Sequence, residues 1–144
     1  MLEIKRLSIE EAKILVDGAT EKSNAMGIPM CIAVCDESGH LIAFDRMDGG
    51  KISSISIAID KAFTGAVARN GTHVYNQLCQ PGQPTFGIHV TNGGHFSIIG
   101  GGLPVKVDGV IVGGIGISSG TAVQDLEVAE AAVAYFYEKT GYKA

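Results

Sequence analysis

Small and hydrophobic residues recur at three- and four-residue spacing near the start of the chain, which is the period of an α-helix. Ser8-Ile-Glu-Glu11 has the spacing of a capping box, in which serine and glutamate side chains bond the first backbone amides. Glycine at position 27 is typical of a helix end. The pattern therefore predicts a helix from Ile9 to Met26.

Short hydrophobic runs separated by turn residues predict strands and hairpins. Asp36-Glu-Ser-Gly39 separates the first two runs, and Asp108-Gly109 separates the last two and tolerates the positive φ of a two-residue turn. The expected strands are Met30 to Cys35, His40 to Phe44, Phe96 to Ile99, Leu103 to Val107 and Val110 to Ile117.

The middle of the chain supports two interpretations. Ser54 to Asp60 alternates small or polar residues with isoleucine, as in a half-buried strand, yet the same residues continue a helical stripe toward Arg69. We favour a helix, because good helix formers follow and Asn70-Gly71 can end it. A short helix from Thr72 to Cys79 is then expected, and Gln80 to Gly87 is a loop dense in proline and glycine.

A long helix is expected at the end of the chain, from Ala122 to Lys139. Thr121-Ala-Val-Gln124 is a second capping box, and Gly141 is a suitable stop. Apolar residues form two faces of this helix, one with Leu126, Ala129, Val133 and Phe136 and one with Val128, Ala132 and Tyr135. The second face predicts self-association. Hairpin-linked strands with helices between them indicate one α+β domain over residues 1–144 with a mainly antiparallel sheet.

Composition and charge restrict the classes of function. The chain is 46% hydrophobic and 18% charged, below the roughly 25% charged residues of an average domain, which again favours an oligomer. A net charge of −4 without a basic run argues against a nucleic-acid partner. Neither a signal peptide nor a membrane span is apparent, and three cysteines fit a reducing compartment, so we expect a cytoplasmic protein.

The glycine-rich segment before the last helix resembles two catalytic motifs. Gly116-Ile-Ser118-Ser-Gly120 matches the nucleophile elbow of hydrolases, but all four histidines precede Ser118, whereas that fold places its histidine after the serine. The glycines also resemble a dinucleotide fingerprint, but no strand follows the helix to complete a βαβ unit. A binding site for a small anion or carboxylate beside Gly116, Ser118 and Asp125 is an alternative that the sequence leaves open.

Metal ligands are sparse. Cys31 and Cys35 lie four residues apart on one expected strand, about 13 Å from each other, and cannot share a tetrahedral metal. His89 and His95 flank a glycine-containing loop and are candidate ligands of a metallocofactor.

Four motifs together resemble one known family. They are Arg46-Met-Asp-Gly49, Lys61-Ala-Phe-Thr-Gly65, Gly101-Gly-Leu-Pro104 and the run from Val112 to Asp125. The chain resembles the GlcG/HbpS-like family of haem-binding or haem-degrading domains, which also form the C-terminal part of PduO-type corrinoid adenosyltransferases. The resemblance implies a profilin-like fold with about five strands and assembly into homo-oligomers. Ser119 departs from the glycine that the family usually has there.

The resemblance implies an oligomeric accessory protein that binds a tetrapyrrole, haem or a corrinoid, and it favours a binding module over an enzyme without deciding between them. The alternative is a small-metabolite-binding enzyme or accessory factor of a glycolate, diol or glycerol (B12-dependent) pathway. Haem needs an apolar wall, cations for its propionates and an axial donor. Arg46 or Lys61 are candidates for the cations, and Tyr75, His89 or His95 for the donor, with Gln80 to Gly94 as a movable edge.

Overall fold

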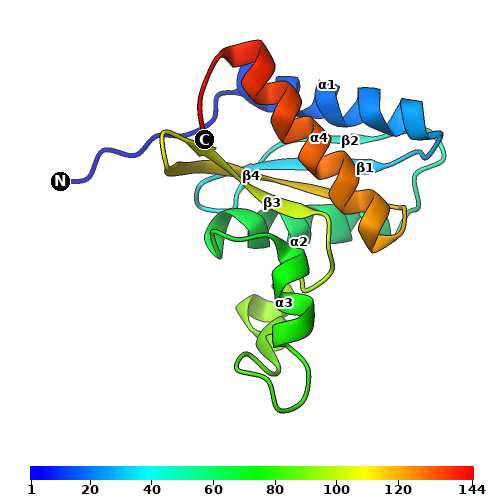
Figure 1. Cartoon of the computed structure of the whole chain (residues 1–144), viewed down its shortest axis with the longest axis vertical. Helices are drawn as coiled ribbons and strands as arrows, with labels where there is room; N and C mark the ends of the chain where they lie inside the picture. The colour runs from blue at the N-terminus through cyan, green and yellow to red at the C-terminus, as the bar shows by residue number, and fades with distance from the viewer.

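One antiparallel sheet with helices on both faces organises the chain in the computed structural model, which describes residues 1–144 (Figure 1). The α+β class predicted from the sequence is confirmed. In chain order the elements are α1 (Ile9–Met26), β1 (Cys31–Asp36), β2 (Leu41–Arg46), α2 (Ser54–Val67), α3 (Thr72–Leu78), the short 3-10 helices η1 (Ile88–Val90) and η2 (Asn92–Gly94), β3 (Gly102–Val107), β4 (Val110–Ser118) and α4 (Ala122–Thr140). None of these helices is both long enough and apolar enough to cross a membrane.

The sheet has four strands in the order β2-β1-β4-β3, so the expectation of about five is wrong. Phe96 to Ile99 does not form the additional strand, because its polar groups bond side chains instead of a neighbouring strand. The amide of Ser97 donates to Thr64 Oγ1 (2.8 Å), and the carbonyl of Ile99 accepts from Thr72 Oγ1 (2.6 Å). The two predicted hairpins, β1–β2 and β3–β4, are both present.

Helix α2 covers one face of the sheet and lies unusually close to it. Its buried residues Ala58, Ala62 and Ala66 face the glycines of β4. A Cβ added at Gly116 would lie 2.0 Å from the carbonyl oxygen of Ala58, and one at Gly114 would lie 2.5 Å from that of Ala62. Alanine facing glycine therefore fixes the helix-to-sheet distance, and the helical interpretation of this segment is confirmed.

Helices α1 and α4 lie together on the opposite face (Figure 1). Both predicted capping boxes are formed, at Ser8 and Thr121. The second apolar face of α4 is not free for a partner, which removes our reason for expecting self-association through it. Val128 and Ala132 are fully buried within the chain, and Tyr135 packs on Gly18 of α1, where a Cβ would lie 2.7 Å from Tyr135 Cβ.

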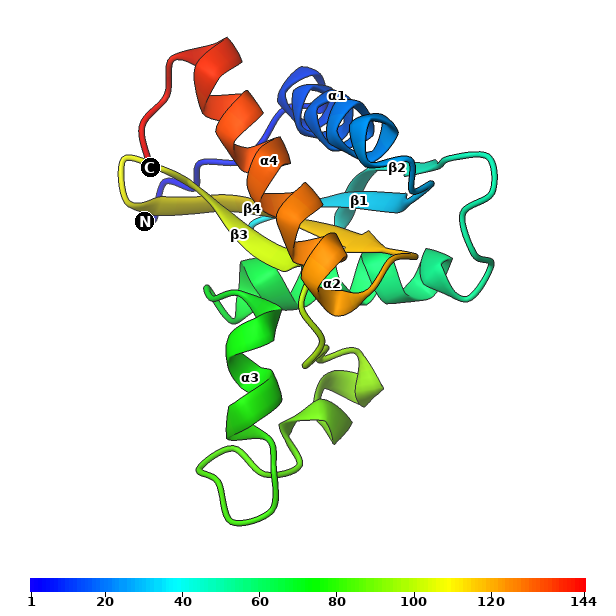
Figure 2. The ribbon, with the colours of Figure 1, turned by 45° about the vertical axis from the view of Figure 1, so that its right-hand side comes forward.

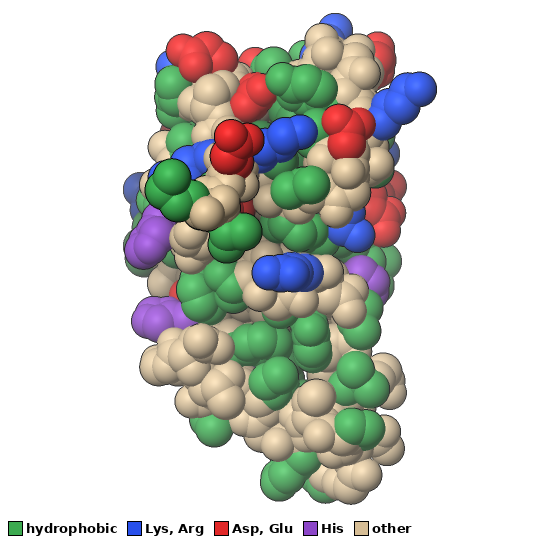
Figure 3. Space-filling model, turned by 90° about the vertical axis from the view of Figure 1, so that its left-hand side faces the viewer, with side chains coloured by type: hydrophobic (Ala, Val, Ile, Leu, Met, Phe, Trp, Pro, Cys, Tyr) green, Lys and Arg blue, Asp and Glu red, His purple; other side chains and the backbone are tan.

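Residues 72–101, which contain α3, η1 and η2, project from the sheet and its helices as an arm (Figures 1 and 2). No Asp, Glu, Lys or Arg occurs between Arg69 and Lys106. The lower part of the face in Figure 3 is accordingly free of acidic and basic side chains. Thr72 joins the two ends of the arm. Its hydroxyl donates to the carbonyl of Ile99 and accepts from the amide of Gly102 (2.9 Å).

Candidate functional site

Lys61 and Asp125 form a buried ion pair between helices on opposite faces of the sheet. Lys61 Nζ donates to Asp125 Oδ2 (2.8 Å) and to the carbonyl of Ile117 at the end of β4 (2.9 Å). The second carboxylate oxygen of Asp125 accepts from the amide of Gly120 (2.9 Å). The pair thus joins α2, β4 and α4 at one point.

The ion pair is closed to solvent and to ligands. Lys61 is 1% exposed and Asp125 is 2% exposed. Burial lowers the pKa of Lys61, and the hydrogen bond and charge of Asp125 oppose that shift. A Cβ at Gly101 would lie 3.0 Å from Lys61 Nζ, so no room remains beside the ammonium. The structure brings three candidate site residues together here, Lys61, Gly116 and Asp125, as a packed structural cluster.

Ser118 also lies in the interior, and its hydroxyl donates to Ser54 Oγ (3.0 Å). The hydroxyl is thus bonded to another serine and not to a histidine. The neighbouring Ser119 has φ +118°, a backbone conformation that favours glycine, and its hydroxyl accepts from the amide of Lys51 (3.0 Å). The residue that departs from the family pattern therefore occupies a glycine-like position.

Arg46 lies apart from the other candidates. It is exposed at the end of β2, which forms one edge of the sheet, whereas the Lys61–Asp125 pair lies where β3 begins on the other side of β4.

All three candidate iron donors belong to the arm, and each has a different partner. The ring of Tyr75 packs edge-on against Phe96, with ring centroids 4.9 Å apart. His89 Nδ1 lies 3.0 Å from the thiol sulfur of Cys79. His95 Nδ1 lies 2.8 Å from a carboxylate oxygen of Asp60 on α2.

His95 has the environment expected of an imidazole that binds iron. Its side chain is 65% exposed, and the carboxylate of Asp60 can only accept, so the Nδ1–H donates to it and Nε2 is left without a hydrogen-bond partner. The backbone carbonyl of His95 accepts from Thr64 Oγ1 (3.3 Å), which holds the segment to the same helix face. Asp60 was not predicted as the hydrogen-bond partner of His95. The only feature in the sequence that could have indicated it is its position one helical turn before Thr64.

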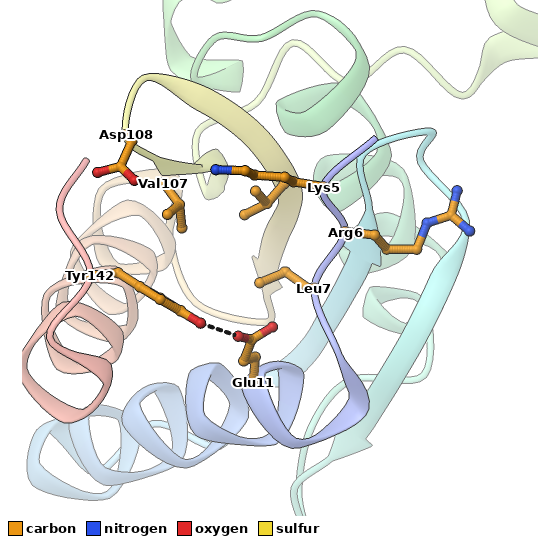
Figure 4. A pocket seen from close by; sticks show the side chains of 8 residues that line it. Lys5, Arg6, Leu7, Glu11, Val107, Asp108 and Tyr142 are labelled. Atoms are coloured by element: carbon orange, nitrogen blue, oxygen red, sulfur yellow. Dashed lines mark hydrogen bonds between the residues drawn. The ribbon is translucent and has the colours of Figure 1, made fainter. Parts of the chain in front are cut away.

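Two cavities elsewhere in the chain are weaker candidates for haem. One of about 310 Å³ lies between the N-terminal segment, α1 and the β3–β4 hairpin (Figure 4), and its Arg6 is already paired with Glu37 outside the lining. Tyr142 donates to Glu11 there (2.9 Å), and this hydrogen bond raises the pKa of Tyr142, which disfavours the phenolate that iron would bind. The other, of about 240 Å³, includes His73, which sequence analysis did not select, and lies between α3 and the start of α4.

Comparison with protein families gives one match that spans most of the chain. The family model described as haem degrading protein HbpS-like matches residues 7–134. An uncharacterized 15.0 kDa protein from the dhaT-dhaS intergenic region of Citrobacter freundii is 34% identical over 94% of this chain and 96% of its own. Protein GlcG of Escherichia coli K12 is 34% identical over 78% of this chain and 81% of its own. Corrinoid adenosyltransferase PduO of Salmonella typhimurium is 30% identical over 89% of this chain but only 38% of its own length.

Solved structures show the same fold. Klebsiella pneumoniae protein ORFY superposes with a TM-score of 0.92 at 29% identity and covers 94% of each chain. A PduOC:heme complex superposes with a TM-score of 0.86 at 29% identity and covers 90% of this chain and 94% of its own.

Proposed function

Because the chain belongs to the family of haem-degrading HbpS-like proteins, we propose that it binds haem on the arm, with His95 as a ligand to the iron. One related structure is a heme complex, which supports the same class of ligand here. The observation that carries the proposal is the pairing of His95 with Asp60 beside an uncharged surface.

The chain's own residues would orient and tune this ligand. Asp60 accepts the Nδ1–H of His95 and thereby fixes the ring orientation and the tautomer with a free Nε2. Haem would supply the iron that this nitrogen binds. Thr64 holds the backbone of His95 against α2. Because the donor is fixed from two positions of one helix, it needs little rearrangement on binding.

The surface of the arm suits the porphyrin plane better than it suits the propionates. Phe86, Val90 and Ile99 are exposed on it, at 66%, 70% and 46%, and apolar groups of this kind cover a porphyrin face. The arm offers no Lys or Arg, and Lys61 is already paired with Asp125. We therefore place the haem between copies of the chain in a homo-oligomer, where a second copy supplies the cations.

We propose a binding role, because the hydrogen bonds of His95 to Asp60 and from Thr64 hold the residue in place and leave Nε2 as the ligand atom. Three free cysteines fit a reducing compartment such as the cytoplasm. Haem is preferred over a corrinoid, which remains the second candidate because PduO is a corrinoid adenosyltransferase.

Hemin titration of the purified protein tests the proposal. The parent protein should give a saturable Soret shift, and His95→Ala should change the iron spectrum while the melting temperature stays the same. Asp60→Asn should weaken binding by roughly tenfold, in the range known for partners of metal-ligating histidines. His40→Ala, remote from the arm, is the matched control. If His95→Ala binds hemin with the parent's spectrum, His95 is not the ligand; saturable binding of cobalamin but not hemin would favour the corrinoid.

A further inference from the structure

A further cavity, whose lining does not include His95, lies between the end of α2 and the β3–β4 hairpin. Its volume is about 570 Å³. The lining residues are Glu37, Ala66, Val67, Arg69, Lys106, Gly109, Val110 and Ile111.

The cavity holds two cations that no acidic residue of the chain neutralises. Neither Arg69 nor Lys106 forms a salt bridge or a side-chain hydrogen bond; the ion pairs of the chain use Arg6, Lys22, Lys61 and His95 instead. The acidic residue in the lining, Glu37, is already bound by Arg6 through both carboxylate oxygens. In a protein of net charge −4, this cavity is therefore an unusual local excess of positive charge.

Arg69 occupies a backbone position that the chain elsewhere gives to glycine. Helices α1 and α4 both end in a left-handed glycine, Gly27 at φ +70° and Gly141 at φ +75°. Just beyond α2 the left-handed residue is Arg69, at φ +59°. An arginine is strained in this conformation and glycine is not. The side chain of Arg69 is thus present at a cost to stability, which points to a role for its guanidinium.

The rest of the lining defines the class of ligand. Val67, Val110 and Ile111 form an apolar wall, and Val110 is 46% exposed. A guanidinium binds a carboxylate with two parallel hydrogen bonds, and an ammonium adds a point charge. The apolar wall favours a ligand with an aliphatic body, which inorganic phosphate lacks. We propose that this cavity binds an organic monocarboxylate with an aliphatic body, its carboxylate between Arg69 and Lys106.

Titration of the haem-free protein with octanoate, followed by amide NMR shifts, tests this site. Octanoate should bind saturably and shift the amides of Val67, Val110 and Ile111. Octanol, which has the same body without the charge, and inorganic phosphate, which has charge without the body, should both bind at least tenfold more weakly. If octanol binds as tightly as octanoate, the binding is apolar adsorption and the proposal is wrong. If phosphate binds as tightly as octanoate, the proposed class of ligand is wrong.

Two variants separate the role of the cations from the stability of the fold. Arg69→Gly should raise the melting temperature by about 3 °C, because it relieves the left-handed strain, while octanoate affinity falls about tenfold. Lys106→Gln should cause a similar loss of affinity without changing the melting temperature. Lys13→Gln, exposed on α1, is the control and should bind as the parent does. If Arg69→Gly and Lys106→Gln both keep the parent's affinity, the proposal is wrong. Neither cation contacts His95, and titrating the same variants with hemin distinguishes a failure of this site from a failure of the proposed haem site.

Discussion

Lys61 keeps a charged group in the protein interior because Asp125 and the carbonyl of Ile117 replace the water it lost. A buried pair of this kind adds little net stability over an apolar pair, but removing one partner leaves an uncompensated charge. Gly101 lies against the ammonium and has no side chain that could move in to cover that charge.

Asp125→Ala should therefore lower the free energy of unfolding by about 3–5 kcal/mol. The double variant Lys61→Met/Asp125→Leu should recover most of the loss, because it removes both charges while keeping side-chain volume. Urea denaturation of the parent, the single variant and the double variant measures both effects. A double variant no more stable than Asp125→Ala would show that packing, not charge, dominates at this position.

Gly116→Ala should destabilise the protein by about 3 kcal/mol, at the upper end of the cost of overpacking. Its Cβ would meet the backbone of α2, which cannot move without displacing Ala58 and Ala62 together. Thermal unfolding gives the measurement, with Ser56→Ala on the exposed side of α2 as the control. A melting temperature equal to the parent's would mean that α2 can move away from the sheet at little cost.

At the scale of single residues, the pairing of His95 with Asp60 could not be predicted from the sequence. The two residues are 35 positions apart, and Asp60 lay in the segment whose pattern fitted either a strand or a helix. From the sequence, Lys61 and Asp125 could be named together as candidates only because both lie in motifs that carry the family resemblance. Neither the burial of Lys61 nor its occupied hydrogen bonds follow from periodicity, because both depend on contacts between helices on opposite faces of the sheet.

At the scale of elements, local signals predicted the helices and hairpins well. Capping boxes, the left-handed Gly27 and Gly141 and the Asp108-Gly109 turn each act within a few residues, and the structure has them. The predicted end of α2 at Asn70-Gly71 is wrong: the left-handed residue after this helix is Arg69, and Gly71 has φ −65° and precedes α3. The strand predicted for Phe96 to Ile99 does not form, and the reason lies in residues far away in the sequence. Its backbone groups bond Thr64 and Thr72, which the sequence gives no means of pairing with it.

Helix α2 should protect the two thiols of β1 from chemical modification. Burial raises the pKa of Cys31 and raises that of Cys35 to about 12, so little thiolate exists at pH 8. We expect iodoacetamide to modify Cys79 on the arm first in the native protein and to reach Cys31 and Cys35 only after unfolding. Mass spectrometry of peptides from native and urea-treated samples measures this order. Early modification of Cys35 would indicate that α2 opens readily.

At the scale of the whole molecule, the arm is held to the remainder of the protein through few elements. Thr72 ties its two ends together with bonds to Ile99 and Gly102. Segments with few buried contacts open more readily than a core, so the arm and the sheet should differ in local stability.

Thr72→Val should raise hydrogen-exchange rates across residues 72–101 by about tenfold, because it leaves a buried amide and a carbonyl without their partner. Exchange in β1 and β4 should not change. Mass-spectrometric exchange of the parent and the variant tests this, with Thr85→Val, within the arm but away from its base, as the control. Equal acceleration in the arm and in β4 would mean that the two unfold as one unit.

The strand order β2-β1-β4-β3 leaves β2 and β3 as open edges of the sheet, and an open edge can recruit a strand from another molecule. Neither edge favours such recruitment. Pro104 lies within β3 and has no amide hydrogen to donate, and β2 ends in the exposed charged residues Asp45 and Arg46. Association between copies by continuation of the sheet is thereby disfavoured, so copies that meet have to do so through helix surfaces or the arm. The same two features guard the folded chain against edge-to-edge aggregation.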